Sequence, residues 1–364
     1  MRLVGAKCGL MNIVILDDYQ DAVRKLACAS KLDALSAKVY TNTVKGVGQL
    51  AVRLKDAEIV VLIGARTHIT RSLLSKLPKL RCIVQAGCMG SHIDLQACTA
   101  HGVAVAANSH AAHAVAEFTW ALLMAASRRL PQYIANLRHG VWQQSGLRAI
   151  SMPPNFGLGT ALRGKTLGVW GFGNVGQLVA GFGRAFGMRV LVWGSEQARA
   201  AACAQGYVAA GERTQLFAQS DFLTLHLRLS ERTRGIIGLS DLMQMKPTAT
   251  LVNTAHAELF QPDSLAAALG RGHPGMAAVD VYESEPIMQG QPLLRLENCL
   301  CTPHISDVEL ENYEQYFNAA FDNILDFIVG KPSNVLNPDA LQLKRNKEQA
   351  KDKSSISKAL PRKR

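Results

Sequence analysis

The chain has 364 residues, of which 48% are hydrophobic and 19% are charged, so it can bury more than one core. Its formal net charge of +12 is uneven: residues 341–364 hold nine Lys or Arg against two Asp or Glu, and residues 1–10 add two positive charges. The rest of the chain carries only +3, which argues against a specific nucleic-acid surface.

Apolar strand-like runs alternate with helical patterns from residue 11 onward, which predicts an α/β protein with parallel sheets. Residues 1–10 lack the cleavage site of a signal peptide and are expected to be an extension. The first expected strands are Ile13–Leu16, Val39–Tyr40, Ile59–Ile63, Cys82–Gln85 and Val103–Ala106. Expected helices here are Ser72–Leu77, Leu95–Ala100 and a long helix from about Val115 to Arg129 that stops at Pro131.

A second, more regular series of elements follows a loop rich in Ser, Pro and Gly at residues 144–160. Its expected strands are Thr166–Trp170, Val190–Trp193, Phe222–Leu227, Ala249–Asn253, Met276–Val279 and Leu300–Thr302. Its expected helices are Val175–Phe186, Asp263–Leu269 and a last helix at Val308–Val329. The two series predict two doubly wound parallel-sheet domains.

The strongest motif is a glycine-rich turn between the expected strand at Thr166–Trp170 and an apolar helix. Its residues are Gly171, Phe172, Gly173, Asn174, Val175 and Gly176. In a dinucleotide-binding unit the first glycine permits the tight turn, the second admits the pyrophosphate and the third lets the helix approach the strand. The helix N-terminus then offers N–H groups to the phosphates. The motif therefore predicts a dinucleotide site.

The choice between NAD and NADP stays open at the next strand. A carboxylate is expected near Gly194 to hold the ribose hydroxyls, and none is present. Ser195 and Glu196 follow Gly194, and Glu196 can serve as this acid although it comes two residues late. Arg199 can instead meet a 2′-phosphate. We favour NAD, with NADP as the alternative.

The other composition signals point to an ordinary intracellular protein. No apolar run approaches the roughly 18–20 residues that span a membrane. The eight cysteines show no CxxC spacing, which predicts reduced thiols in a cytoplasmic protein and no metal site.

Taken together, the motifs resemble the D-isomer-specific 2-hydroxyacid dehydrogenases, the family of D-3-phosphoglycerate dehydrogenase. The matching segments are Ala86–Asp94, Val115–Trp120, Gly164–Gly176, Phe222–Gly235, Met245–Asn253, Ala278–Pro286 and Thr302–Ile305. The resemblance implies a Rossmann cofactor domain (113–302) inserted into a flavodoxin-like split substrate domain (11–112 and 303–338), then a basic disordered tail (339–364). It also implies a homodimer and a small 2-oxo or 2-hydroxy acid as substrate.

Catalysis in that family uses an Arg, a Glu and a His, and the resemblance assigns the last two to Glu285 and His304. Reduction of a 2-oxo acid needs a proton for the developing alkoxide, and an imidazole that titrates near neutrality suits that transfer. A carboxylate bonded to the ring would orient it and favour its charged form. Glu283 competes for this role, but the spacing to Pro286 favours Glu285. Asp280 matches the family acid beside the nicotinamide.

The family Arg lies in a segment that reads N-T-x-R-G, whereas residues 253–257 read N-T-A-H-A, so His256 stands where the Arg belongs. The resemblance gives Thr254 in this segment a cofactor contact. A histidine offers at most two donors in place of a planar fork. Losing a buried charged pair costs about 3–5 kcal/mol, so rates are expected to fall by roughly 10²–10⁴.

Further departures lie on the substrate side. The resemblance assigns substrate binding to Arg66, Gly87, Cys88 and Met89. Met89 replaces a small loop residue, and Ser306 replaces a glycine after the catalytic His. Gly64 stands where phosphoglycerate-specific relatives have Arg, which argues against phosphoglycerate as the substrate.

Three hypotheses remain open at this point. The first is an active dehydrogenase with an altered substrate. The second is a weakly active or inactive relative that still binds a dinucleotide. The third is a different oxidoreductase on the same fold.

Overall fold

The computed structural model describes residues 11–33, 35–87, 89–107, 112–147 and 152–343. These residues form two compact units: the first draws on Met1–His110 and Leu310–Arg364, and the second on Ala111–Glu309. The return to the first unit falls between residues 309 and 310, seven residues after the expected boundary, so His304 belongs to the same unit as Glu285. The expected extension at 1–10, Cys88 and the chain from 344 lie outside the described residues.

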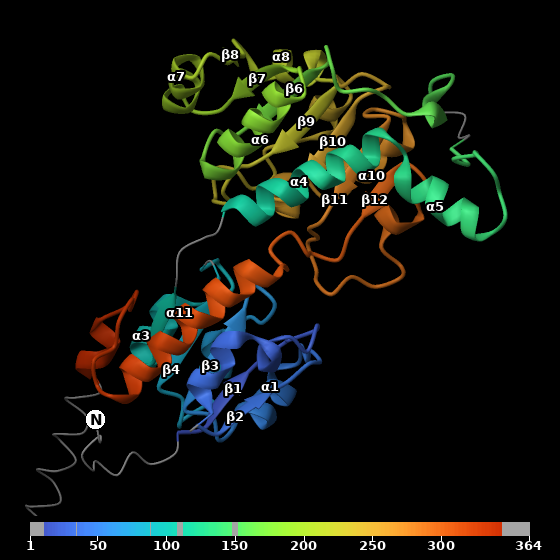
Figure 1. The fold of residues 1–364 in the computed structure, drawn as a ribbon. Coiled ribbons are helices and arrows are strands. Elements are labelled where there is room, and N and C mark those ends of the chain that lie inside the picture. The colour runs from blue at the N-terminus through green and yellow to red at the C-terminus, as the bar shows by residue number, and fades with distance from the viewer. Residues whose placement is uncertain (1–10, 34, 88, 108–111, 148–151, 344–364) are drawn as a thin grey trace, which may run out of the picture. The chain divides into compact units, whose positions relative to one another are not determined.

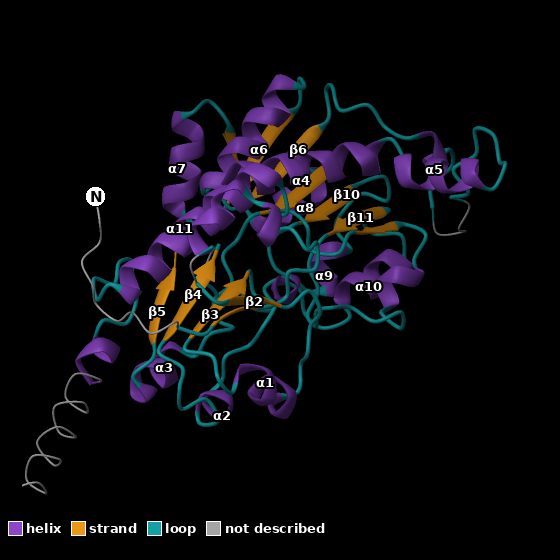
Figure 2. Ribbon diagram, turned by 60° about the horizontal axis from the view of Figure 1, so that its bottom comes forward, coloured by secondary structure: helices purple, strands orange, loops and turns teal. Residues whose placement is uncertain are grey.

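The first unit is built on a five-stranded parallel sheet (Figures 1 and 2). Its strands are β1 Ile13–Ile15, β2 Ala37–Val39, β3 Ile59–Ile63, β4 Cys82–Ala86 and β5 Ala104–Ala107. The order β2-β1-β3-β4-β5 is that of flavodoxin, so the expected fold is confirmed. The central strands β3 and β4 are buried throughout, as continuous apolar runs in a covered parallel sheet should be.

Helices cover both faces of this sheet (Figure 2). They are α1 Val47–Leu54, α2 Arg71–Leu74, α3 Leu95–His101 and α11 Leu310–Ile328, with the 3₁₀ turns η1 Val23–Lys25 and η2 Ala27–Leu32. Helices α1 to α3 pack their apolar residues against one face, with Val14, Val60 and Ile83. Helix α11 returns from the far end of the chain and contacts β4.

The expected tail begins too early. Residues 339–343 are helical and Ala340 is fully buried. Asn337 anchors this stretch at the edge of the sheet, because its side chain accepts from the Val105 N–H (2.7 Å) and donates to the Val103 carbonyl (3.0 Å). The ordered chain therefore continues past residue 338, and charge composition alone did not reveal it.

The second unit is built on a seven-stranded parallel sheet (Figure 1). Its strands are β6 Thr166–Trp170, β7 Arg189–Trp193, β8 Val208–Ala209, β9 Phe222–Leu225, β10 Thr250–Asn253, β11 Met276–Val279 and β12 Cys299–Cys301. The order β12-β11-β10-β9-β6-β7-β8 is the Rossmann order with one further strand, which confirms the expected class. The switch point lies between β6 and β9.

The helices of this unit are α4 Ala112–Ser127, α5 Leu130–Arg138, α6 Asn174–Ala185, α7 Glu196–Ala204, α8 Arg213–Gln219, α9 Leu239–Leu242 and α10 Ser264–Gly270. Short 3₁₀ turns are η3 Phe156–Leu158, η4 Ala257–Leu259 and η5 Pro292–Arg295. Helix α5 was not anticipated, because Pro131 was interpreted only as a stop. In the structure Pro131 occupies the first turn of α5, where a missing N–H costs nothing.

Arg129 joins α4 to the segment that follows α5. Its side chain is almost fully buried, and its guanidinium donates to the carbonyls of Ala126 (2.5 Å) and Phe156 (3.1 Å). The same group lies 4.0 Å from the centroid of the Phe156 ring. Ala126 lies in the last turn of α4, so its carbonyl brings the negative end of the helix dipole to this buried cation.

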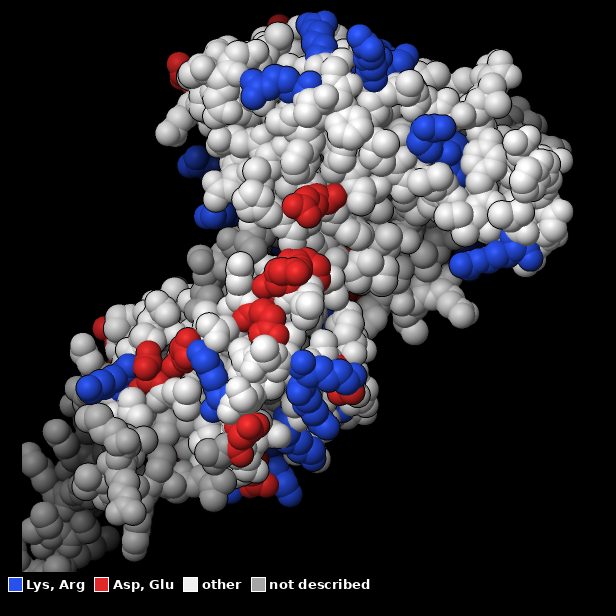
Figure 3. Space-filling view, viewed as in Figure 1, with Lys and Arg blue, Asp and Glu red and all other residues white. Residues whose placement is uncertain are grey.

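Charged side chains of both signs are mixed over the face drawn in Figure 3. Several form exposed pairs in the first unit, such as Lys79 with Asp56 at 2.7 Å. Among the described residues no helix is long and apolar enough to cross a membrane. The same residues include no group of three or more His, Cys, Asp or Glu arranged to hold a metal ion.

Candidate active site

The expected site residues of the second unit follow the carboxyl ends of its parallel strands. The glycine loop follows β6, Ser195 follows β7, His256 follows β10, Asp280 follows β11 and His304 follows β12. Because these strands are parallel, all five positions lie at one edge of the sheet. Ligands of open α/β sheets bind at that edge, beside the switch point.

The glycine loop has the shape that a dinucleotide requires. Gly171 has φ +100°, and a Cβ there would lie 2.6 Å from the carbonyl oxygen of His226. A Cβ on Gly176 would lie 2.0 Å from the carbonyl oxygen of Gly171, so the helix can approach the turn only without one. Gly173 caps α6 and faces open space. The space beside Gly173 and the N-terminus of α6 is thus open at the place where the sequence predicts a pyrophosphate.

The side chains at the end of β7 do not decide between NAD and NADP. Ser195 caps α7, and its hydroxyl accepts from the Ala198 N–H at 3.2 Å. Glu196 is the exposed first residue of α7. The guanidinium of Arg199 lies 4.8 Å from the centroid of the Trp193 ring. Both Glu196 and Arg199 thus lie within the first turn and a half of the same helix.

His304 and Glu285 are brought together although they are 19 residues apart. His304 Nδ1 lies 2.6 Å from Glu285 Oε2, and the other oxygen of that carboxylate accepts from the Tyr282 N–H at 2.9 Å. The His304 side chain is 40% exposed, so the far side of the ring can reach a small molecule. Glu283, the competing carboxylate, lines a separate pocket.

Asp280 holds the loop that carries His304. Its buried carboxylate accepts from the Thr302 hydroxyl (2.7 Å) and from the N–H groups of Ile305 (3.0 Å) and Ser306 (2.9 Å). His304 itself has φ +51°, a left-handed conformation that is strained by about 1–3 kcal/mol in a residue with a Cβ. The three bonds fix this conformation. The expected contact of Asp280 with the nicotinamide stays a prediction.

The pKa of His304 lies above its ordinary value. Burial favours the neutral ring, but the hydrogen bond and charge of Glu285, with the charges of Asp307 and Asp280, outweigh it and raise the pKa. The proton is therefore retained to a higher pH than on a free histidine. A raised pKa suits a group that delivers a proton near neutral pH.

His256 stands in a well-defined turn after β10. Asn253 shapes this turn, because its side chain donates to the His256 carbonyl (2.9 Å) and accepts from the Ala255 N–H (3.0 Å). Thr254 is buried, and its hydroxyl lies 2.6 Å from that of Thr119 on α4. The backbone that presents residue 256 is thus fixed from two sides.

The first unit carries the other expected residues at the carboxyl edge of its own sheet. Arg66 follows β3 and donates to the Asp17 carbonyl (2.6 Å) and to the Tyr313 hydroxyl (3.2 Å). Gly87 follows β4 with φ +91°, and a Cβ there would lie 3.2 Å from the Tyr316 ring. Met89 is partly buried against the apolar cluster beneath. Cys88 lies outside the described residues.

His226 was missed by sequence reasoning. It directly follows β9 at the switch point, and its carbonyl lies against Gly171. Burial lowers the pKa of His226 to about 3, so the ring is neutral, and its Nε2 has no hydrogen-bond partner among the described residues. Its place after β9 was not predictable, because the expected strand ran to Leu227 whereas β9 ends at Leu225. The available signal was its position within a segment that resembles the family.

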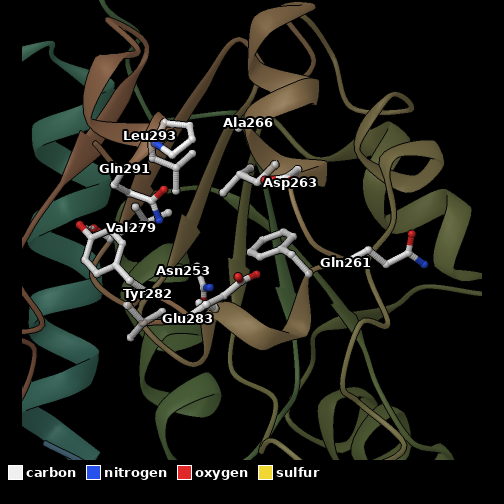
Figure 4. Close-up of a pocket in the computed structure, with 14 residues that line it drawn as sticks. Asn253, Gln261, Asp263, Ala266, Val279, Tyr282, Glu283, Gln291 and Leu293 are labelled. Carbon is white, nitrogen blue, oxygen red and sulfur yellow. Dashed lines mark hydrogen bonds between the residues drawn. The ribbon is translucent and has the colours of Figure 1, made fainter. Parts of the chain in front are cut away.

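A separate pocket of about 90 Å³ is lined by Asn253 and Val279, the last residues of β10 and β11, and by residues that follow these strands. Figure 4 shows Tyr282 and Gln291 on one side of it, with Gln261 and Asp263 opposite. Its lining contains neither His304 nor Glu285 nor the glycine loop. It is therefore not the site just described.

Comparison with known proteins identifies the family to which the chain belongs. Residues 120–306 match the family described as D-isomer specific 2-hydroxyacid dehydrogenase, NAD binding domain. The chain belongs to this family. A glyoxylate reductase of Aeropyrum pernix is 36% identical over 276 residues, which cover 75% of this chain and 81% of the relative. A D-3-phosphoglycerate dehydrogenase of Methanocaldococcus jannaschii is 34% identical, covering 81% of this chain but only 53% of the relative.

Solved structures agree with this membership. A Ralstonia solanacearum oxidoreductase, described as a candidate D-3-phosphoglycerate dehydrogenase, is 57% identical with a TM-score of 0.89 and covers 91% of this chain and 98% of its own. A D-lactate dehydrogenase of Aquifex aeolicus, solved with NAD and lactic acid, is 26% identical with a TM-score of 0.71, over 90% and 99%. This chain is thus an oxidoreductase of the D-2-hydroxyacid dehydrogenase family, with an NAD-binding domain.

Proposed function

We propose that the protein interconverts a small 2-oxo acid and the D-2-hydroxy acid, with His304 as the general acid and base and Glu285 as its partner. The observation that carries the proposal is the 2.6 Å contact between His304 Nδ1 and Glu285 Oε2. Bound NAD supplies or accepts the hydride in this chemistry. Gly171, Gly173 and Gly176 would hold its pyrophosphate, and Ser195, Glu196, Thr254 and Asp280 are the proposed contacts for the rest.

His304 performs the proton step. Glu285 occupies Nδ1, which leaves Nε2 to donate a proton to the substrate oxygen as it gains negative charge. The carboxylate also stabilises the imidazolium before that transfer. In the reverse direction the neutral ring removes the hydroxyl proton. Asp280 keeps the ring in place through its bonds to the 302–306 loop.

Arg66, Gly87, Cys88 and Met89 are the proposed substrate-binding residues of the first unit. Arg66 offers a fixed planar cation, because both of its terminal nitrogens are already oriented by protein oxygens. His256 is proposed to bind the substrate in place of the family Arg. Gly64 offers no cation for a phosphate group, which favours a 2-oxo acid without a phosphate over phosphoglycerate.

His256 sets the expected rate. The turn formed by Asn253 already fixes the backbone of residue 256. A His256→Arg variant should therefore raise kcat/KM on 2-oxo acids, by up to the roughly 10²–10⁴-fold that loss of the family guanidinium is expected to cost. The experiment measures NADH and NADPH affinity by fluorescence, then turnover on glyoxylate, pyruvate and hydroxypyruvate for both proteins. No turnover of any 2-oxo acid by either protein would refute the proposed reaction.

A protein that binds NAD with little turnover is the second candidate, and His256 is the observation that favours it. The same titration separates the two. Tight NADH binding with negligible turnover, restored by His256→Arg, would favour this candidate. Rapid turnover by the natural protein would exclude it.

We also propose a homodimer formed through α5. This helix buries none of its residues, and Leu130, Ile134 and Leu137 recur at helical spacing on one exposed stripe, 47%, 51% and 56% exposed. Trp142 and Leu158 nearby are 71% and 75% exposed. An apolar stripe of this kind marks a contact surface. Light scattering should give twice the 39.4 kDa chain mass.

A Leu137→Asp variant should shift that mass toward the monomer, because a charge would have to be buried in the interface. Val52→Asp is the matched control, since Val52 is 72% exposed on α1 of the other unit and should leave the mass unchanged. A monomeric natural protein would contradict the proposed dimer.

A further inference from the structure

Two cysteines lie side by side on the strand that leads to His304. Cys299 and Cys301 are the first and last residues of β12, and their sulfur atoms are 3.7 Å apart. Both side chains pack against the same apolar cluster, because residues two apart on a strand share a face. Both are partly exposed, and β12 is the edge strand, paired only with β11.

Tyr282 connects this thiol pair to the proposed acid–base pair. Its hydroxyl donates to the Thr302 carbonyl at 2.8 Å, one residue after Cys301 and two before His304. Its N–H donates to Glu285 at 2.9 Å. Tyr282 also belongs to the cluster against which both cysteines pack. A displacement of Cys301 is therefore transmitted to both ends of the His304–Glu285 contact.

The pKa values of the two thiols are shifted in opposite directions. The hydrogen bond with Cys299 lowers the pKa of Cys301 against the effect of burial, and Tyr282 adds to the lowering. The pKa of Cys299 is raised by the same hydrogen bond and by burial. Burial raises the pKa of Cys28 and of Cys98 to about 12, which keeps those thiols inert. The thiolate on this strand is thus best placed on Cys301.

We propose that Cys299 and Cys301 are a redox site, at which hydrogen peroxide oxidises the two thiols to a disulfide that reversibly lowers turnover. The Cys301 thiolate attacks the peroxide oxygen, the O–O bond breaks, and a sulfenic acid forms while hydroxide leaves and is protonated to water. The Cys299 thiol then attacks that sulfur and releases a second water. Two thiols are oxidised, one peroxide is reduced, and a dithiol returns both thiols by exchange.

The disulfide changes the shape of β12. Residues two apart on an extended strand are about 6.6 Å apart at Cα, while bridged cysteines favour about 5.5–6 Å. Closing the bond therefore shortens the strand, and an edge strand can bend because one side is unpaired. Tyr282 lines the pocket in Figure 4 together with Pro292 and Leu293. The pocket leaves room for the Tyr282 side chain to move with the shortened strand. A strained disulfide is also easily reduced.

The effect on turnover rests on the proposed role of His304, whereas formation of the disulfide does not. Hydrogen peroxide should lower the mass of the full-length protein by two hydrogens, with the new bond mapped to residues 299 and 301 after digestion. Turnover should fall by about 10²-fold, since a misplacement of about 1 Å at a catalytic group has that effect. Dithiothreitol should restore mass and turnover together.

Three variants complete the test. Cys299→Ser/Cys301→Ser should keep its turnover before and after peroxide. Cys203→Ser removes an exposed cysteine on α7 of the same unit and should respond like the natural protein. Absence of the 299–301 bond after peroxide would overturn the site, and a bond that leaves turnover unchanged would overturn the coupling. Full turnover by His304→Gln would instead refute the acid–base role while the mapped bond stands.

Discussion

Gly176→Ala is expected to abolish tight NADH binding and to destabilise the second unit. The added Cβ would lie 2.0 Å from the Gly171 carbonyl oxygen and 3.1 Å from its carbon, both backbone atoms. The loop cannot yield easily, because Gly171 is itself held at φ +100° against the His226 carbonyl. Overpacking of this kind costs about 1–3 kcal/mol of unfolding free energy.

Binding should suffer more than stability. A shifted loop loses phosphate hydrogen bonds worth about 1.5–3 kcal/mol each, so losing one or two raises Kd at least about tenfold. Fluorescence titration with NADH and a thermal melt report the two effects. Unchanged NADH affinity in Gly176→Ala would show that the loop is not the nucleotide site.

Gly181 provides a matched control, and Gly173 separates the effect on NADH binding from the effect on stability. Gly181 lies on the same helix with nothing within 4 Å of an added Cβ, so Gly181→Ala should bind NADH normally and gain up to about 1 kcal/mol of stability. Gly173 has φ −81° and also faces open space. Gly173→Ala should therefore melt like the natural protein, yet bind NADH weakly because its methyl group occupies the place of the phosphate.

The sheets were predictable where burial is continuous. The observed bounds of β3 and β6 equal the expected ones, at Ile59–Ile63 and Thr166–Trp170. Strand β8 has only two residues, Val208 and Ala209, which is too short for any periodic signal. Helix α5 was missed because a proline ends one helix and begins another equally well.

The site was predictable only in part, because its contacts join distant residues. Local pattern identified the glycine loop, since strand, turn and helix are contiguous there. The His304–Glu285 contact came from the family resemblance, and no local periodicity indicates a pairing across 19 residues. The three bonds from the 302–306 loop to Asp280 depend on how β11 and β12 pair, which a sequence pattern does not specify.

The same geometry gives a strong prediction for the acid–base pair. His304→Gln should lower kcat for 2-oxo acid reduction by about 10²–10⁴, the usual contribution of a positioned general acid. NADH affinity should remain within a few-fold, because the glycine loop follows a different strand. Steady-state kinetics and the fluorescence titration separate the two quantities. Equal loss of kcat and of NADH affinity would point to a damaged fold rather than to a lost proton donor.

Glu285→Gln tests the partner through pH. Reduction requires protonated His304, so its rate falls as pH rises through the pKa of that ring. Glu285 raises this pKa through its hydrogen bond and its charge, so its removal should move the fall of kcat/KM to lower pH. The matched control is Glu283→Gln, because Glu283 lines the other pocket and should leave the profile in place. A profile that moves equally in both variants would mean that general surface charge, and not the 2.6 Å contact, sets the pKa of His304.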